Sequence, residues 1–143
     1  MAIFTYSIYI DTIPQKLWEA LTSSEFTRQY WGGRTMESDW KVGSDIHIVQ
    51  PQGTQTAEKV GKVLICDPPR LLSYTTDHAN PSASSTMTFE IVVTPAQVRL
   101  NITHEVMGGE MPTMVVEGWY AISSSLKTML ETGKPLDYSW WRG

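Results

Sequence analysis

His104 is the side chain in this sequence whose type and position could do chemistry. It follows Leu100 and Ile102 at intervals of two within Val98–Val106, and this alternation predicts a strand. His104 therefore shares the apolar face of that strand, where an imidazole could act as a general base or as a hydrogen-bond donor to a ligand near neutral pH. The alternative is a structural imidazole at the edge of the core, hydrogen-bonded to a backbone carbonyl.

Tyr74 is the second candidate, because it shares the parity of Leu72 and Thr76 in the predicted strand Leu71–Thr76. A phenol that projects into an apolar pocket could orient a carbonyl or hydroxyl group of a ligand. The alternative is a tyrosine that only fills the core. With His104 as proton shuttle and Tyr74 orienting a carbonyl, the same two residues would serve an enzyme of the cyclase or lyase kind.

Other chemistry lacks its usual motifs. The three histidines, His47, His78 and His104, show no tight metal-ligand spacing, so we expect neither a metal nor a cofactor. The sequence has no nucleophile elbow of the Gly-x-Ser-x-Gly type, no phosphate-binding Gly-x-x-x-x-Gly-Lys and no dinucleotide fingerprint. Hydrolase, kinase and dehydrogenase interpretations therefore lose support. The single cysteine, Cys66, lies in an apolar run and is expected to be a small buried side chain.

Composition limits the remaining classes. A formal charge of −4 and a pI near 5.3 argue against nucleic-acid binding, which needs clustered lysine and arginine. No apolar run approaches the roughly 18 residues of a membrane span, and residues 1–3 do not begin a signal peptide. One cysteine cannot form an internal disulfide, which suits a reducing compartment. We therefore expect a cytoplasmic protein that binds neither nucleic acid nor membrane.

Hydrophobic periodicity divides the chain into strands and short helices. Ile3–Ile10 alternates as a strand with one buried face, and Pro14 suits the first position of a short helix. Thr22-Ser23-Ser24-Glu25 matches a capping box that would start a second short helix, which Gly32-Gly33 would end. Further alternating runs between turn signals predict strands at Asp45–Val49, Lys59–Cys66, Leu71–Thr76, Met87–Thr94 and Val98–Val106.

A long helix is predicted after the last strand, from beyond Pro112 to Glu131, with Gly133 placed to end it. About 20 helical residues span roughly 30 Å, which is enough to cross a curved sheet. This order of elements predicts an α+β domain at residues 1–133, in which the helix buries its apolar stripe on the sheet. Residues 134–143 contain Trp140 and Trp141, and we expect this aromatic tail to pack on its own domain or on a second copy.

Seven short strings follow one another between residues 3 and 133: Pro14–Leu21, Tyr30–Gly33, Ser38–Gly43, Gly61–Leu64, Asp67–Leu71, Gly118-Trp119 and Leu130–Gly133. In this order they resemble the homologues of the activator of the heat-shock-protein-90 ATPase, a family of the START-like (SRPBCC, Bet v 1-type) superfamily. The resemblance implies a helix-grip fold, in which a curved antiparallel sheet of six to seven strands wraps a long C-terminal helix. Two short helices follow the first strand, and a cavity lies between sheet and long helix.

In such a fold, the inward side chains of sheet and long helix would line the cavity. The expected ligand-binding residues are Trp31, Trp40, Leu72, Tyr74, Met87, Phe89, His104, Val115, Trp119 and Ile122. A role in the core alone is the alternative for the tryptophans. Related domains serve as lipid or hormone carriers, polyketide cyclases, ring-hydroxylase subunits and co-chaperone modules, so the fold does not define the chemistry.

We expect a binding domain rather than an enzyme, with a small, mostly apolar molecule as its partner. An enzyme that uses His104 is one alternative. A protein-interaction module is another, either a co-chaperone-like partner in a stress response or a homodimer built on the aromatic tail. The co-chaperone version is weakened because the co-chaperone relatives carry a further N-terminal domain that grips the chaperone, and nothing in this sequence provides it.

Overall fold

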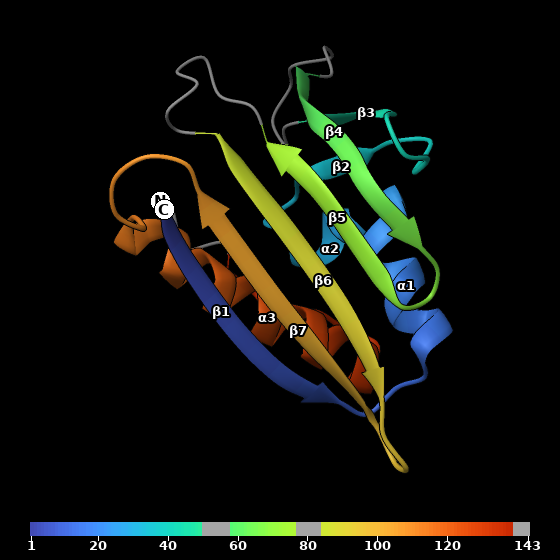
Figure 1. The fold of residues 1–143 in the computed structure, drawn as a ribbon. Coiled ribbons are helices and arrows are strands. Elements are labelled where there is room, and N and C mark those ends of the chain that lie inside the picture. The colour runs from blue at the N-terminus through green and yellow to red at the C-terminus, as the bar shows by residue number, and fades with distance from the viewer. Residues whose placement is uncertain (50–57, 77–83, 139–143) are drawn as a thin grey trace.

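Seven antiparallel strands form one sheet in the computed structural model, which describes residues 1–49, 58–76 and 84–138 (Figure 1). Their order from one edge to the other is β1-β7-β6-β5-β4-β3-β2. The strands are β1 (Ala2–Ile10), β2 (Thr35–Glu37), β3 (Asp45–Val49), β4 (Glu58–Asp67), β5 (Leu71–Thr76), β6 (Ser85–Val93) and β7 (Val98–Val106). The six to seven strands that the resemblance implied are confirmed, and periodicity had predicted six of them. Strand β2 had no sequence signal, because three residues are too few to show a period.

Strict alternation turns one face of the sheet toward the core. Along β6 and β7, buried residues alternate with more exposed ones over almost the whole length of each strand. The register places Met87 opposite His104 and Phe89 opposite Ile102. Directly opposed side chains lie on the same face of a sheet. His104 therefore lies on the inner face, as its parity predicted.

Two short helices follow the first strand. They are α1 (Pro14–Thr22) and α2 (Ser24–Tyr30). Pro14 occupies the first turn of α1 as predicted, because proline already has a helical φ and lacks an N–H that would need a partner. The predicted capping box is wrong. Ser23 is the N-cap of α2 but makes no side-chain cap hydrogen bond, and the Thr22 hydroxyl donates instead to the Trp18 carbonyl of the preceding helix at 2.9 Å.

The long helix α3 (Thr113–Thr132) lies on one side of the sheet, behind β1 and β7 in Figure 1. It ends where predicted, at Gly133, whose φ of 89° is left-handed and whose N–H donates to the Met129 carbonyl. Ser123 and Ser125 are buried on this helix among the apolar residues. None of the described helices combines the length and the apolar character needed to cross a membrane.

The last turns of α3 hold the end of β1. Lys127 Nζ donates to the Tyr9 carbonyl at 2.8 Å, and the Asp11 N–H donates to Glu131 Oε2 at 2.8 Å. Lys127 and Glu131 also pair with each other at 2.7 Å. The hydrogen bonds from Lys127 and from the Asp11 N–H lower the pKa of Glu131. This polar clamp joins the end of β1 to the end of α3, and its partners Asp11 and Glu131 lie 120 residues apart in sequence.

The described part of the C-terminal tail folds back onto α3. The Leu136 N–H donates to Ser125 Oγ at 3.1 Å, which gives that buried hydroxyl a partner. Trp140 and Trp141 lie outside the described residues, as does His78. Packing of the aromatic residues of the tail therefore stays a prediction.

Cys66 is half-buried rather than buried, which corrects the prediction for this residue. A register shift between Val63 and Ile65 in the pairing of β4 with β5 places Cys66 opposite the buried Leu72, on the inner face next to the end of β4. Such an irregularity re-aims side chains, and Leu64 and Ile65 are consecutive exposed residues here. Burial and the neighbouring Asp67 carboxylate raise the pKa of the Cys66 thiol, so it stays protonated near neutral pH.

Candidate functional site

Five aromatic side chains form a continuous row between the sheet and the helices, which we term the aromatic row. Ring centroids lie 6.1 Å apart for Trp40 and Tyr74, 5.7 Å for Tyr74 and Phe89, 5.8 Å for Phe89 and Trp119, and 5.6 Å for Trp119 and Trp31. Most of these contacts are edge-to-face, a geometry that the ring quadrupoles favour. The structure therefore brings together five of the predicted ligand-binding residues.

Neighbouring strands position the middle of this row. Tyr74 on β5 stands opposite Met87 on β6, and Leu72 stands opposite Phe89. All four are buried. Met87 is also opposite His104 on β7, so a short path of inner-face residues leads from Tyr74 to the histidine.

The two ends of the row are partly exposed. Trp31 is the C-cap of α2, and Trp40 adopts a left-handed φ of 55° in the turn between β2 and β3. Both are half-buried, in contrast to the buried Trp119. The remaining predicted residues, Val115 and Ile122 on α3, are also half-buried and pack against the core.

Trp119 and His104 are joined by a buried hydrogen bond. The indole Nε1–H donates to His104 Nδ1 at 2.7 Å, and the two rings meet edge to face at 5.8 Å. An indole nitrogen can only donate, so Nδ1 must carry the lone pair, and the neutral ring has its hydrogen on Nε2. The basic lone pair of His104 Nδ1 thus already accepts a hydrogen bond from Trp119. Accepting a proton there would require this bond to break, which favours a positioning or donor role over that of a general base.

Two buried tyrosines add neutral phenols to the core. Burial raises the pKa of Tyr74 far above its ordinary value. It does the same for Tyr30, where the proximity of Tyr74 contributes further, and the Tyr30 hydroxyl donates to the Ala20 carbonyl at 2.8 Å. Neither group ionises near neutral pH. Tyr74 can therefore act only as a neutral hydrogen-bonding group or as apolar surface.

Ser123 is a buried polar residue, close in sequence to the aromatic row, that the sequence prediction did not include. It lies one turn after Trp119 on α3, and residues four apart share a helix face. Its side chain is 1% exposed, and its hydroxyl has no hydrogen-bond partner in the described part of the chain. The spacing from Trp119 was visible in the sequence, but serine does not contribute to an apolar stripe.

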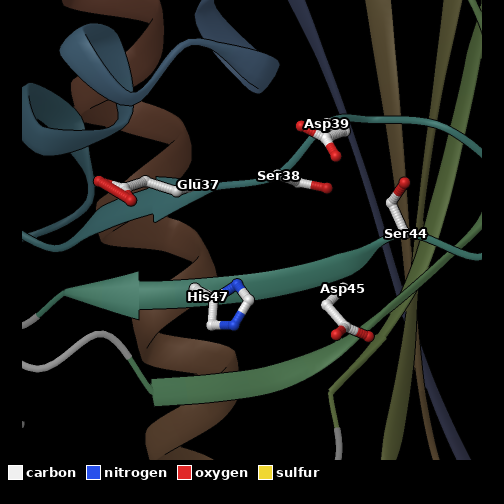
Figure 2. Close-up of a pocket in the computed structure, with 6 residues that line it drawn as sticks. All are labelled: Glu37, Ser38, Asp39, Ser44, Asp45 and His47. Atoms are coloured by element: carbon white, nitrogen blue, oxygen red, sulfur yellow. The ribbon is translucent and has the colours of Figure 1, made fainter.

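A separate polar hollow lies on the outer face of the sheet, around the turn that joins β2 to β3. Figure 2 shows the six side chains around this open space of about 420 Å³, which are Glu37, Ser38, Asp39, Ser44, Asp45 and His47. Asp45 pairs with Lys59 and Lys62 at 3.7 and 3.5 Å. Within residues 1–49, 58–76 and 84–138, no cluster of His, Cys, Asp and Glu is arranged to hold a metal ion.

The curved antiparallel sheet over a long C-terminal helix, with two short helices after the first strand, defines a START-like helix-grip domain. Residues 11–131 match the family model described as Activator of Hsp90 ATPase homolog 1-like protein. The chain belongs to this family.

Solved structures share the fold. The Aha1 dimer from Colwellia psychrerythraea is 22% identical, with a TM-score of 0.77 over 94% of this chain and 99% of that one. Protein MLL2253 from Mesorhizobium loti is 22% identical, with a TM-score of 0.71 over 90% and 96%. CalU16 from Micromonospora echinospora is 19% identical, with a TM-score of 0.70 over 94% and 76%. No curated protein matches the chain.

Proposed function

We propose that this domain binds a small, mostly apolar molecule between the sheet and α3, at the aromatic row. The observation that carries the proposal is the buried Ser123 hydroxyl, which has no hydrogen-bond partner in the described residues. Leaving a buried polar group unsatisfied costs about 1–3 kcal/mol. A polar group on a bound molecule would recover this energy and would orient the molecule along α3.

The surroundings of Ser123 suit a ligand of this kind. Small-molecule sites consist mainly of apolar and aromatic side chains with a few polar groups that fix orientation. The aromatic row supplies the apolar surface, and the hydrogen bond from Trp119 to His104 fixes the orientation of both rings. The ligand class is therefore an apolar skeleton with one or two hydrogen-bonding groups.

Entry requires a ring to move, because the members of the aromatic row contact one another. Trp31 and Trp40 are the half-buried members at its two ends. Trp31 contacts Trp119 directly, so its displacement would uncover the Trp119–His104 pair. We expect tryptophan fluorescence to change when a ligand binds.

The test is native mass spectrometry of the protein purified from its host, compared with the denatured mass. A discrete extra mass that denaturation removes is expected. Ser123→Ala should lower its occupancy, whereas the control Ser124→Ala, whose hydroxyl donates to the Tyr120 carbonyl within α3, should keep it. A bare protein that also takes up no anilinonaphthalene sulfonate would contradict the proposal.

A second proposal concerns assembly, namely that two copies of this chain form a homodimer. It is supported by the Colwellia psychrerythraea structure, which is described as a dimer and matches this chain over 99% of its own length. Light scattering in solution tests it directly, with twice the chain mass as the expected result. Deleting residues 134–143 tests whether the tail forms the dimer contact. A truncated protein that still has twice its own chain mass would exclude a dimer built on the tail.

A further inference from the structure

Strand β1 is an edge strand, and two independent hydrogen bonds show which of its backbone groups face outward. Lys127 Nζ, which does not belong to the sheet, donates to the Tyr9 carbonyl. In the β6–β7 hairpin, the Thr94 N–H donates to the Gln97 carbonyl at 3.0 Å, so the odd residues of β7 bond to β6 and its even residues to β1. The register pairs even residues with even residues. The N–H and C=O groups of Ile3, Thr5 and Ser7 therefore point away from the sheet.

Among the described residues, this edge lacks the protection that edge strands usually carry. Natural sheets block their edges with short strands, charges, proline or bulges. The opposite edge follows this rule, because β2 has three residues and ends at the exposed Glu37. Strand β1 has nine residues with no charge and no proline, and it pairs with β7 without a register shift. The clamp of Lys127 and Glu131 lies at its C-terminal end.

We infer that the free edge of β1 pairs with β1 of a second copy, antiparallel, with Thr5 on the two-fold axis. This inference rests on the homodimer proposed above and names its interface. In this register Ile3 faces Ser7 of the second copy, and Thr5 faces Thr5. Shifting the register by two residues in one direction brings in Tyr9, whose carbonyl Lys127 already binds. A shift in the other direction extends the pairing to Met1, beyond the end of the strand.

The same register completes an aromatic cluster on the inner face. Phe4 would stand opposite Tyr6 of the second copy in a non-hydrogen-bonded pair, where side chains approach most closely. Within one chain, Tyr120 already packs against Phe4 at 5.9 Å and against Tyr6 at 5.4 Å between ring centroids. Tyr120 is 43% exposed. The surface is thus uncharged and complementary to itself under a two-fold rotation, which fits a second copy of this chain.

A charge-swap experiment tests the interface. Thr5 is exposed on the outer face, so Thr5→Lys and Thr5→Glu are compatible with folding of the monomer. Each variant alone places like charges opposite each other, and we expect the dimer dissociation constant to rise about tenfold or more. Mixing the two variants should restore dimers. Thr103→Lys is the matched control, since Thr103 is the register partner of Thr5 on β7 and lies inside the sheet.

Hydrogen exchange supplies a readout that depends on parity along β1. In the wild-type dimer the amides of Ile3 and Ser7 should exchange slowly, and in the Thr5→Lys monomer they should exchange fast. The amides of Tyr6 and Ile8, which bond to β7, should stay protected in both. Fast exchange at Ile3 and Ser7 in a wild-type dimer, or equal dissociation by Thr103→Lys, overturns the β1 interface but leaves the dimer. A wild-type protein that is monomeric by light scattering overturns both.

A dimer that survives Thr5→Lys but is lost when residues 134–143 are deleted assigns the contact to the tail and also overturns the inference. A partner strand from another protein would protect Ile3 and Ser7 only in a complex of mixed mass. That result would replace the second copy as the occupant of this edge.

Discussion

Trp119 on α3 donates its indole hydrogen to Nδ1 of His104 on β7 at 2.7 Å, inside the core. This bond fixes the rotation of both rings, since each has only one nitrogen in position for it. It also ties the helix to the sheet by a directional contact inside the core, in addition to the exposed hydrogen bond from Lys127 to the Tyr9 carbonyl.

Trp119→Phe removes the indole N–H, so His104 Nδ1 loses this hydrogen-bond donor inside the core. We expect the free energy of unfolding to fall by about 2–4 kcal/mol, from the lost volume and the unsatisfied acceptor together. Urea unfolding measures the loss. Trp31→Phe is the control, because Trp31 loses the same volume at a half-buried position. A loss for Trp119→Phe no larger than that of the control would show that the hydrogen bond adds nothing.

Ser123→Ala and Ser125→Ala should change the free energy of unfolding by different amounts or with opposite sign, although both serines are 1% exposed on the same helix. The Ser125 hydroxyl accepts from the Leu136 N–H, so its removal should cost about 1 kcal/mol. The Ser123 hydroxyl has no partner among the described residues, so its removal should be neutral or stabilising in the ligand-free protein. Thermal unfolding of the two variants side by side measures this, and equal destabilisation would contradict it.

Gly61→Ala should be strongly destabilising. A Cβ at this position would lie 1.7 Å from the Thr75 carbonyl oxygen, so the pairing of β4 with β5 would have to separate. We expect a loss of about 3 kcal/mol or more, in the range of severe steric substitutions. At Gly43, with a φ of +88° and no atom within 4 Å of a built Cβ, alanine should cost only about 1–2 kcal/mol. Denaturant titrations of the two variants give the comparison, and a Gly61→Ala protein of near wild-type stability would be inconsistent with the register.

Glu131→Gln tests the clamp at the end of β1 through pH. The pKa of Glu131 is lowered in the folded state, so its carboxylate stabilises the fold above the ordinary glutamate pKa of about 4.3, and this contribution disappears as pH falls through the lower folded-state value. We expect Glu131→Gln to cost roughly 0.5–1 kcal/mol at pH 7, a small value because Glu131 and its hydrogen bonds lie at the exposed surface. The two proteins should converge only once the pH lies below the lowered folded-state pKa of Glu131. Glu117→Gln, at an exposed position on the same helix, is the control for removing a carboxylate outside the clamp.

Periodicity predicted most of this fold because each element that carries the core is long enough to repeat its pattern. The inward position of His104 followed from strand parity, and the position of Trp119 followed from helical spacing. The hydrogen bond between them could not be predicted, because it depends on where α3 crosses β7. The face on which Cys66 lies could not be predicted either, since a register shift in β4 changes parity without a sequence signal. Ser123 was missed because burial of a polar residue leaves no trace in hydrophobic periodicity.

The pairing of the first strand with the last has a consequence for biosynthesis. Ile10 pairs with Val98 and Ala2 with Val106, so β1 finds its partner only after roughly 90 to 100 further residues have been translated. At the usual rate of about 5–20 residues per second, this delay lasts roughly 5–20 s. During that time the uncharged nine-residue segment that forms β1 has no partner strand. The nascent chain is therefore prone to association at β1, and production of the protein should benefit from chaperones that bind this segment during synthesis.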